Sequence, residues 1–445
     1  MPGLFGTSGV RGLANVEVDP PLALRLGLGL ASLLGNSGRV VVGRDPRTSS
    51  EMLERALLAG LLSGGVTAVR AGMVPTPVLA FSVREWRAEA GVMVTASHNP
   101  PEYNGLKCWD GEGAAFTPER EEELEREMGR ARGVEWRRVG GLEERDPVGE
   151  YLRWVLGRFP LREGHRVVVD CGNGAACRVT PPLLREAGCE VLSLHGFPSG
   201  LFPGRGPEPT AESLSDLSRA VVSRGAEVGF AHDGDADRIA VVDDRGRFAP
   251  PDKLLALVAS HLVRKGEKVV TTVDASRVVE EWVERKGGKV VRTRVGDVSV
   301  AWALRREGGR FGGEPSGAWI LPEAHLAPDG PLATLLLLRM LEEEGRRLSE
   351  LLDEVPSYPL LREKVPCAPG EKGERMRRLR EKVERLEGVV GVEEVDGLRI
   401  SFEEGSWLLV RPSGTEPCLR VTCEARTEGE ARRRVREVLS LLAVR

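Results

Sequence analysis

The sequence predicts an α/β protein of several domains, in which three related α/β domains precede a smaller C-terminal α+β domain. Three observations predict this fold class. The chain has 445 residues, more than one hydrophobic core usually covers, so several domains are expected. A strand, helix, glycine, strand unit occurs three times between residues 38 and 291, and the pattern changes near the C-terminus.

The repeated unit consists of a β-branched strand, an amphipathic helix that stops at glycine, and a second apolar strand. In the first copy Gly38-Arg-Val-Val-Val-Gly43 leads through a helix over 51–62 to a strand at Val66. The second copy uses 167–169, 182–187 and 191, and the third uses 268–270, 278–286 and 290–291. This alternation indicates α/β layers with buried sheets. We therefore predict three related domains, at residues 1–146, 147–248 and 249–356.

The final domain, predicted at residues 357–445, follows a different pattern. Leu398-Arg-Ile-Ser-Phe402 and Trp407-Leu-Leu-Val410 predict a β-hairpin, and Leu419-Arg-Val-Thr-Cys423 predicts a third strand before a closing helix over 428–442. We expect an antiparallel sheet with helices on one face.

Composition excludes several classes of protein. The chain has 63 basic and 67 acidic side chains and a net charge of −4, and no basic patch is interleaved with aromatics, so nucleic acid is not an expected partner.

Apolar stretches such as 332–341 are too short to span a bilayer, and the N-terminus has no leader pattern. We expect a cytoplasmic monomer or homodimer whose seven cysteines are reduced thiols.

A serine loop is the most informative motif. Thr95-Ala-Ser-His-Asn-Pro-Pro-Glu-Tyr-Asn-Gly105 follows the apolar run 91–94, so a strand delivers Ser97 to a loop without regular structure. His98 and Lys107 place a titratable imidazole and a fixed cation beside the hydroxyl. Most loop serines only form turns, but the neighbouring His98 and Lys107 indicate a loop that acts on phosphate.

Three carboxylates form the second motif. Asp233-Gly-Asp-Ala-Asp-Arg238 lies between two apolar runs, at a junction between strands. The small residues between the carboxylates allow Asp233, Asp235 and Asp237 to converge on one hard cation, and oxygen ligands without His or Cys favour Mg²⁺ over zinc. Like charges this close repel one another, which favours a metal site over a solvated turn.

Two further turns carry groups that suit hydroxyls and anions. Gly312-Gly-Glu-Pro-Ser-Gly317 offers the acid Glu314 and the hydroxyl of Ser316 in a stiff turn, which suits sugar hydroxyl groups. Arg411-Pro-Ser-Gly-Thr-Glu-Pro417 combines an arginine fork, two hydroxyls and the amides around Gly414. This second combination predicts a compact cradle for a phosphate.

Together with Leu4-Phe-Gly-Thr-Ser-Gly-Val-Arg-Gly12, these segments resemble, in order and over the whole chain, the α-D-phosphohexomutase superfamily. The resemblance implies mixed sheets in the first three domains, a central cleft, and an intramolecular phosphotransferase acting on a small-molecule hexose phosphate. It implies a phosphoryl group carried by Ser97 and one Mg²⁺ per chain, bound by Ser97, Asp233, Asp235 and Asp237. The other implied site residues are His98, Lys107, Arg11 and Arg238 at the reacting centre, Glu314 and Ser316 at the sugar, and Arg411, Ser413, Gly414 and Thr415 at the distal phosphate.

The implied reaction passes through a 1,6-bisphosphorylated sugar, which turns over in the cleft and returns its other phosphate to Ser97. A hexose 1,6-bisphosphate is the expected activator. Mg²⁺ and preplaced cations are expected to stabilise charge on the transferring group. Lys107 or His98 would serve as general acid/base, and the sequence does not rank the two.

The preferred sugar depends on finer features. Bacterial relatives usually carry a histidine where Ala318 stands, but 295–300 and 322–330 resemble archaeal-type phosphoglucosamine mutases, which isomerise an amino sugar phosphate between positions 6 and 1. Asp297 or Glu323 could pair with a protonated 2-amino group. A phosphoglucomutase/phosphomannomutase of broad specificity is the alternative.

Three other classes fit less well. A haloacid-dehalogenase-like phosphatase would use Asp233 as nucleophile, but Ala236 stands where it would carry threonine or valine after Asp235, and it would not need the Ser97 loop. A non-catalytic sugar-phosphate sensor needs neither a nucleophile nor three carboxylates. A dinucleotide fingerprint at 170–174 lacks its third glycine, because Cys177 stands there.

Overall fold

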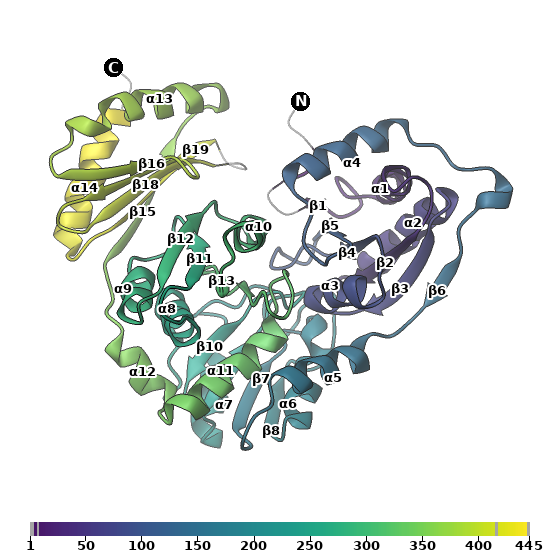
Figure 1. Cartoon of the computed structure of the whole chain (residues 1–445), viewed down its shortest axis with the longest axis horizontal. Helices are drawn as coiled ribbons and strands as arrows, with labels where there is room; N and C mark the ends of the chain where they lie inside the picture. Colours follow the sequence, from purple (N-terminus) through teal and green to yellow (C-terminus); the bar gives the residue numbers. More distant parts are fainter. Residues whose placement is uncertain (1–3, 7–8, 414–416, 443–445) are drawn as a thin grey trace.

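The computed structural model describes residues 4–6, 9–413 and 417–442. These residues form four sheets of six, four, four and five strands, and each sheet with its helices is called a domain, numbered 1 to 4 in chain order. In Figure 1 the domains follow one another along an arc, from domain 1 on the right through domains 2 and 3 to domain 4 at the upper left. Within the described ranges, no helix combines the length and the apolar character that crossing a bilayer requires.

Domain 1 contains a six-stranded sheet in the order β1-β5-β4-β2-β3-β6. Its strands are β1 (Val10–Leu13), β2 (Arg39–Arg44), β3 (Thr67–Met73), β4 (Ala90–Val94), β5 (Tyr103–Asp110) and β6 (Leu142–Glu144). Its helices are α1 (Pro20–Leu33), α2 (Ser50–Ser63), α3 (Thr76–Glu85) and α4 (Pro118–Arg130). The sheet is mixed, because β5 pairs antiparallel with β1 and β4 while β2 pairs parallel with β3 and β4.

Domain 2 has the strand order β10-β9-β7-β8, and only β10 is antiparallel to its neighbour. Its strands are β7 (Arg166–Asp170), β8 (Glu190–Leu194), β9 (Val228–Ala231) and β10 (Ala240–Asp243), and its helices are α5 (Val148–Arg158), α6 (Thr180–Glu186) and α7 (Ser215–Arg224).

Domain 3 has the order β12-β11-β13-β14, with β14 antiparallel. Its strands are β11 (Lys268–Thr272), β12 (Lys289–Thr293), β13 (Phe311–Gly313) and β14 (Trp319–Ile320). Its helices are α8 (Pro251–Leu262), α9 (Val278–Arg285), α10 (Asp297–Glu307), α11 (Gly330–Glu344) and α12 (Leu348–Glu354).

Domain 4 is antiparallel throughout, in the order β15-β19-β18-β17-β16. Its strands are β15 (Leu360–Pro366), β16 (Val389–Glu393), β17 (Leu398–Phe402), β18 (Trp407–Pro412) and β19 (Cys418–Glu424), and its helices are α13 (Lys372–Lys382) and α14 (Glu428–Leu442). Short 3₁₀ segments elsewhere span Trp136–Arg138 and Ala175–Arg178, and within domain 4 Pro369–Glu371 and Val383–Arg385.

The predicted fold class is confirmed. The three repeated units are β2-α2-β3, β7-α6-β8 and β11-α9-β12, and the two strands of each unit pair in parallel. The predicted hairpin is β17-β18, and the predicted third strand and closing helix are β19 and α14. The domain boundaries at 146/147, 248/249 and 356/357 stay a prediction.

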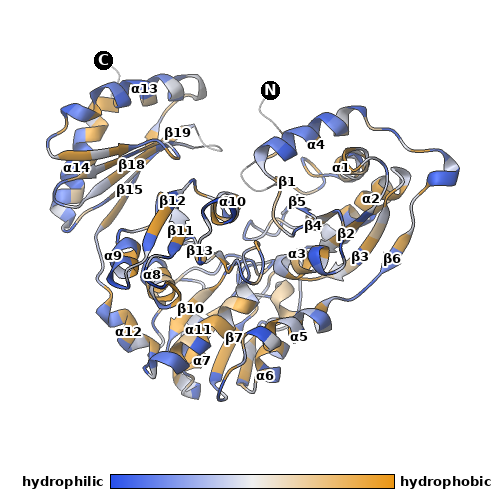
Figure 2. Ribbon diagram, in the orientation of Figure 1, coloured by the Kyte–Doolittle hydropathy of each residue, from blue (hydrophilic) through white to orange (hydrophobic). Residues whose placement is uncertain are grey.

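Buried apolar residues join the first three domains more closely than the fourth. The largest hydrophobic cluster draws residues from domains 1, 2 and 3, among them Phe81, Phe230 and Leu335. Domain 4 has a separate core and meets domain 3 through a small cluster that includes Val273 and Trp407. Figure 2 shows hydrophobic residues along the strands and a largely hydrophilic α13. Domains 1 to 3 therefore form the shared frame on which the site is built.

Candidate active site

Ser97 lies in the serine loop (residues 95–105), just after β4. It is 1% exposed and has a φ of 51°, a left-handed conformation that is uncommon for a residue other than glycine and often marks a functional turn. Its Oγ donates to Asp233 Oδ2 at 2.6 Å, and His98 Nδ1 lies 3.3 Å from the same oxygen. The loop therefore presents the hydroxyl directly to the three carboxylates.

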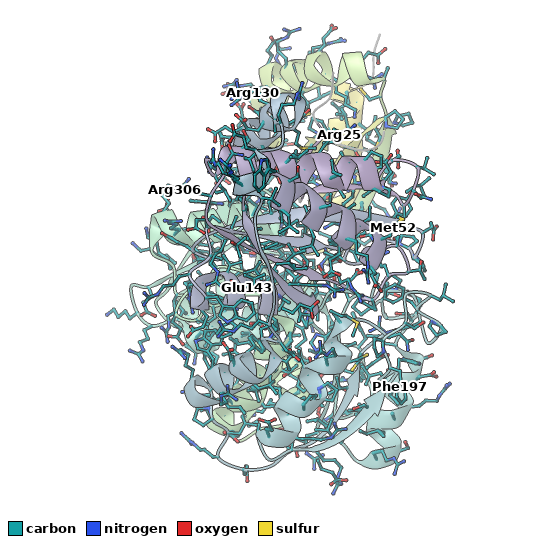
Figure 3. The ribbon with its side chains drawn as sticks, turned by 90° about the vertical axis from the view of Figure 1, so that its right-hand side faces the viewer. Arg25, Met52, Arg130, Glu143, Phe197 and Arg306 are labelled. Atoms are coloured by element: carbon teal, nitrogen blue, oxygen red, sulfur yellow. The ribbon has the colours of Figure 1, made fainter. Side chains whose placement is uncertain are left out.

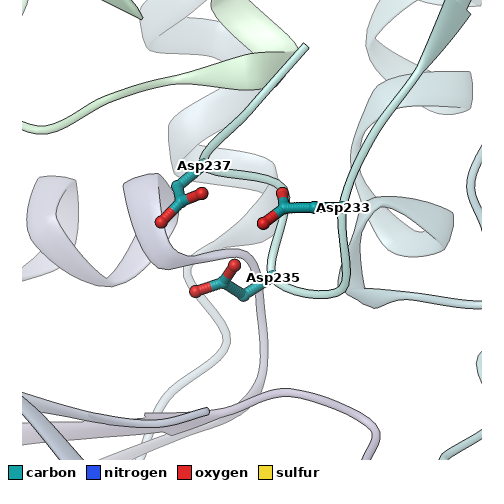
Figure 4. Close-up of side chains that lie close together, drawn as sticks. All are labelled: Asp233, Asp235 and Asp237. Atoms are coloured by element: carbon teal, nitrogen blue, oxygen red, sulfur yellow. The ribbon is translucent and has the colours of Figure 1, made fainter. Parts of the chain in front are cut away.

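The carboxylates lie in the aspartate loop (residues 233–237), which connects the antiparallel strands β9 and β10. One oxygen from each of Asp233, Asp235 and Asp237 lies within 4.8 Å of the others, and Figure 4 shows the three side chains pointing toward one another. All three are buried. The N-terminus of α11 packs on this loop, since Gly330 N donates to Ala236 O at 3.2 Å.

The charges in this loop suit a bound cation. Burial, followed by the charges of Asp237 and Asp235, raises the pKa of Asp233 well above its usual value. Burial acts in the same direction on Asp235, but Lys107 and a hydrogen bond from Thr76 outweigh it, so the pKa of that carboxyl is lowered. Among the described residues, Asp235 Oδ1 and Asp237 Oδ1 are buried without a hydrogen-bond partner. Buried acidic oxygens without partners are the ligands that a hard divalent cation prefers.

Cations surround the carboxylates. Lys107 Nζ lies 3.3 Å from Asp235 Oδ2 and 3.0 Å from Asp237 Oδ2. Arg238 Nε lies 3.9 Å from Asp237 Oδ1, and Arg238 N donates to Asp233 Oδ1 at 3.2 Å. Arg11 Nη1 donates to the side chain of Asn99 in the serine loop at 3.0 Å. All the residues predicted at the reacting centre are thus brought together.

The two candidate acid/base groups differ in what they contact. Burial, followed by Arg238 and Arg11, lowers the pKa of His98 to about 3, so its imidazole is neutral near pH 7. Burial also acts to lower the pKa of Lys107, but Asp235 and Asp237 outweigh it and the pKa is raised. His98 contacts Ser97, whereas Lys107 contacts Asp235 and Asp237.

The predicted sugar turn reaches the same centre from domain 3. Glu314 follows β13, and Gly317 O accepts from Ile239 N at 3.0 Å, which fixes the turn beside the aspartate loop. Glu314 is buried and Oε1 accepts from Gly296 N at 2.9 Å, whereas Ser316 is exposed. Burial, followed by the charge of Asp297, raises the pKa of Glu314 to about 8.

The two candidates for an amino-group contact lie in different places. Asp297 is half-buried at the first position of α10, and the charged groups that act on it most are Lys107, Asp237 and Arg11. Glu323 is exposed and pairs with Arg310 instead. Asp297 directly follows Gly296, whose amide binds Glu314, whereas Glu323 has another partner.

Glu314→Gln is expected to change how stability depends on pH. The folded protein keeps a proton on Glu314 between the ordinary value of 4.5 and about 8, so its contribution to stability falls as the pH rises through this window. A glutamine side chain does not lose a proton in this pH range, so the stability of the variant lacks this pH dependence. We expect the melting temperature of the variant to exceed that of the wild type increasingly from about pH 5 to about pH 8, by several degrees at the upper end. Melting curves measure this, with exposed Glu323→Gln as the control, and parallel pH profiles for wild type and Glu314→Gln would contradict it.

The predicted phosphate cradle is described in part. Arg411 Nη1 donates to Asp396 Oδ2 at 2.6 Å, and the same oxygen accepts from Val295 N at 3.4 Å. Ser413 is buried, and its carbonyl accepts from Lys372 Nζ at 2.6 Å. Gly414 and Thr415, like Thr7 and Ser8 of the N-terminal segment 4–12, lie outside the described residues. The contact with Val295 brings the cradle next to the segment that carries Asp297.

Sequence reasoning missed several residues that position the site. Thr76 Oγ1 donates to Asp235 Oδ2 at 2.6 Å, and Asp45 Oδ2 accepts from Thr95 Oγ1 at 2.8 Å. Arg47 donates to backbone carbonyls of the serine loop. One signal was present: β2 and β4 are parallel neighbours, so the polar residues after both strands meet at one edge of the sheet.

Four family models match the chain in sequence order. They are described as phosphoglucomutase/phosphomannomutase alpha/beta/alpha domain I at residues 2–133, domain II at 155–246, domain III at 250–358 and the C-terminal domain at 364–441.

Curated relatives match over nearly the full length. A "probable phosphoglucosamine mutase" of Thermococcus gammatolerans is 49% identical over 432 residues, which cover 96% of this chain and 95% of that protein. A protein of the same description from Pyrococcus furiosus is 47% identical over 442 residues, covering 98% and 97%.

Solved structures show the same arrangement of domains. A phosphoglucomutase/phosphomannomutase family protein of Burkholderia thailandensis has a TM-score of 0.90 at 29% identity and covers 99% of this chain and 97% of its own. An N-acetylphosphoglucosamine mutase of Aspergillus fumigatus, solved with GlcNAc-6P and magnesium, has a TM-score of 0.61 at 16% identity, covering 98% and 95%. The second similarity shows the fold alone.

Proposed function

Because the chain belongs to the phosphoglucomutase/phosphomannomutase family and is a phosphohexomutase, an intramolecular phosphotransferase of the isomerase class, we propose that it interconverts glucosamine 6-phosphate and glucosamine 1-phosphate. The observation that carries this proposal is the contact of 2.6 Å between the buried Ser97 hydroxyl and Asp233. A hydroxyl held this close to three carboxylates and several cations suits phosphoryl transfer.

The proposed metal site consists of Asp233, Asp235, Asp237 and the phosphorylated Ser97, holding one Mg²⁺. The two buried carboxylate oxygens that have no hydrogen-bond partner in the described chain and the oxygen-only donor set support this assignment. When bound, the ion supplies positive charge beside the transferring phosphoryl group.

The chain's own groups are proposed to orient and protect the phosphoryl group. Asp233 accepts the hydrogen bond from Ser97 Oγ and so aims the oxygen into the site. Lys107, Arg11 and Arg238 supply fixed positive charge, which stabilises the oxygens of the transferring group without reorganisation. The burial of Ser97 limits access of water, which favours transfer to a sugar hydroxyl over hydrolysis.

The sugar phosphate is proposed to lie between the serine loop and domain 4. Glu314 and Ser316 would bind sugar hydroxyls, and Arg411 and Ser413, with Gly414 and Thr415, would bind the phosphate that is not reacting. A 1,6-bisphosphate that turns over between the two half-reactions then presents its other phosphate to Ser97. A hexose 1,6-bisphosphate would prime Ser97 as activator.

The amino sugar is proposed on two grounds. The relatives at 49% and 47% identity carry the description of probable phosphoglucosamine mutases. In addition, Asp297 follows Gly296, which binds Glu314, and its carboxylate would pair with a protonated 2-amino group. Glucose and mannose phosphates remain the second candidate, because the Burkholderia relative is described as a phosphoglucomutase/phosphomannomutase family protein.

Asp297→Asn is expected to reduce the preference for the amino sugar. The variant keeps the shape of the side chain but loses the charge, so kcat/KM for glucosamine 6-phosphate should fall by about tenfold to 100-fold, while turnover of glucose 1-phosphate changes little. A coupled assay with Mg²⁺ and a trace of glucose 1,6-bisphosphate measures both substrates. Glu323→Gln serves as the control, since this residue pairs with Arg310. An equal loss for both sugars would contradict the proposed amino contact.

A further inference from the structure

Arg47 is a buried arginine whose guanidinium is bonded to the serine loop. Its side chain has no exposed surface, and Nε donates to Asp45 Oδ2 at 2.9 Å. The four remaining N–H groups donate to backbone carbonyls of the serine loop, namely those of Ser97, Asn99, Pro100 and Tyr103, at 2.8, 2.7, 2.5 and 2.9 Å. All five donors of the guanidinium are therefore in use.

Asp45 connects the same hydrogen-bond network to the backbone amide of Ser97. Its carboxylate accepts from Ser50 Oγ at 2.7 Å and from Thr95 Oγ1 at 2.8 Å. Thr95 Oγ1 in turn accepts the backbone N–H of Ser97 at 2.9 Å. Both the amide and the carbonyl of Ser97 are thus held by one buried network, which fixes the left-handed backbone at this residue.

Domain 2 packs against the same arginine. Phe202 is buried, and its ring centroid lies 5.3 Å from the Arg47 guanidinium carbon. Its loop approaches domain 1 closely, since a Cβ placed on Gly200 would lie 2.3 Å from Thr48 N. Phe197, labelled in Figure 3, marks the solvent side of this loop with 85% exposure. The loop therefore has an outer end in solvent and an inner end against Arg47.

The aspartate loop touches the serine loop at the carbonyl that Arg47 binds. A Cβ placed on Gly234 would lie 2.6 Å from Ser97 O and 3.5 Å from the Phe202 ring. Ser97 O therefore lies close to both the guanidinium and the backbone of Gly234. A shift of this carbonyl would change the distance between Ser97 Oγ and Asp233.

We propose that Arg47, packed on Phe202, is a positioning residue that holds the serine loop against the aspartate loop and thereby sets the rate of phosphoryl transfer through Ser97. This inference rests on the proposed function. Arg47 cannot bind the transferring phosphoryl group, because its five donors are used and its side chain is enclosed. It acts only through the backbone of the loop, where a displacement of about 1 Å lowers a rate by roughly 100-fold.

The test is Arg47→Lys, which keeps the charge but has three donors on one atom and cannot span four carbonyls. With glucose 1-phosphate, Mg²⁺ and glucose 1,6-bisphosphate, we expect kcat to fall about 100-fold while KM stays within about threefold. In a single turnover, the rate at which glucose 1,6-bisphosphate phosphorylates Ser97 should fall in parallel. Phe202→Leu should lower kcat about tenfold in the same way, because it removes the ring beneath the guanidinium.

Arg70→Lys is the matched control. Arg70 lies in β3 of the same sheet and binds Glu54 and Glu144 at 2.8 and 3.2 Å, but it contacts no part of the serine loop in the described chain. It should lower the melting temperature without lowering kcat. If Arg47→Lys and Phe202→Leu likewise lose only stability, or raise KM while Ser97 is phosphorylated at the normal rate, the inference is overturned. If the wild type takes no phosphoryl group on Ser97, the proposed function fails, and the role of Arg47 fails with it.

Discussion

Replacing Ser97 by alanine is expected to lower kcat/KM by roughly four orders of magnitude or more for glucosamine, glucose and mannose phosphates alike. The substitution removes the oxygen that would carry the phosphoryl group and leaves the three carboxylates in place. The residual rate should not respond to added hexose 1,6-bisphosphate, because no acceptor for its phosphoryl group remains at this position. The coupled assay with Mg²⁺ measures both effects.

Ser82→Ala is a suitable control for this experiment. Ser82 is also a buried serine of domain 1, but its Oγ donates only to Val78 O in α3. We expect near wild-type turnover from it. A phosphatase that uses Asp233 as nucleophile predicts a different result. In that enzyme Ser97→Ala would keep nearly full activity, and Asp233→Ala would be inactive. That pattern would contradict the mutase mechanism.

Asp235→Asn is expected to lower kcat by about 1,000-fold and to weaken the response to Mg²⁺. The variant removes one charge from the proposed metal site but retains a side chain that Thr76 can still bond. Chelating the metal from the wild type should lower activity in the same way, and adding Mg²⁺ should restore it. Titrating activity with Mg²⁺ gives the comparison.

Melting curves separate the metal role from a folding defect. Without metal, Asp235→Asn loses the ion pair with the buried Lys107, so the variant should melt below the wild type. Added Mg²⁺ should raise the melting temperature of the wild type by ligand binding, and raise that of the variant much less. Asp216→Asn, an exposed residue paired with Arg219 in α7, controls for the loss of an aspartate. An Mg²⁺ response in Asp235→Asn equal to that of the wild type would contradict the metal site.

The parts of the site that lie within one short segment were predictable from the sequence. Asp233, Asp235 and Asp237 alternate in a tight loop between two strands, so their convergence follows from local geometry. Ser97 follows a buried strand in the same way. The strand and helix periodicity of the three α/β units was also local, and the parallel pairing of each unit confirmed it.

The rest depends on contacts between distant segments. Arg47 is separated from the carbonyls that it binds by 50 residues or more, and Phe202 comes from a different domain. From the sequence, Asp297 and Glu323 were equal candidates for contact with an amino group. Only the tertiary structure shows that Glu323 forms an ion pair with Arg310. The pKa of Glu314 likewise depends on its burial and on Asp297, neither of which a turn motif specifies.

The most direct test of the account is to locate the phosphoryl group. The wild-type protein would be incubated with glucose 1,6-bisphosphate and Mg²⁺, digested, and mapped by mass spectrometry, with a second sample given excess glucosamine 6-phosphate before digestion. The account predicts one phosphoryl group on Ser97 in both samples, and glucosamine 1-phosphate in the second, because the bisphosphate formed on the sugar returns its other phosphate to Ser97. Turnover without phosphorylation of Ser97, or a phosphoryl group on Asp233, would contradict it.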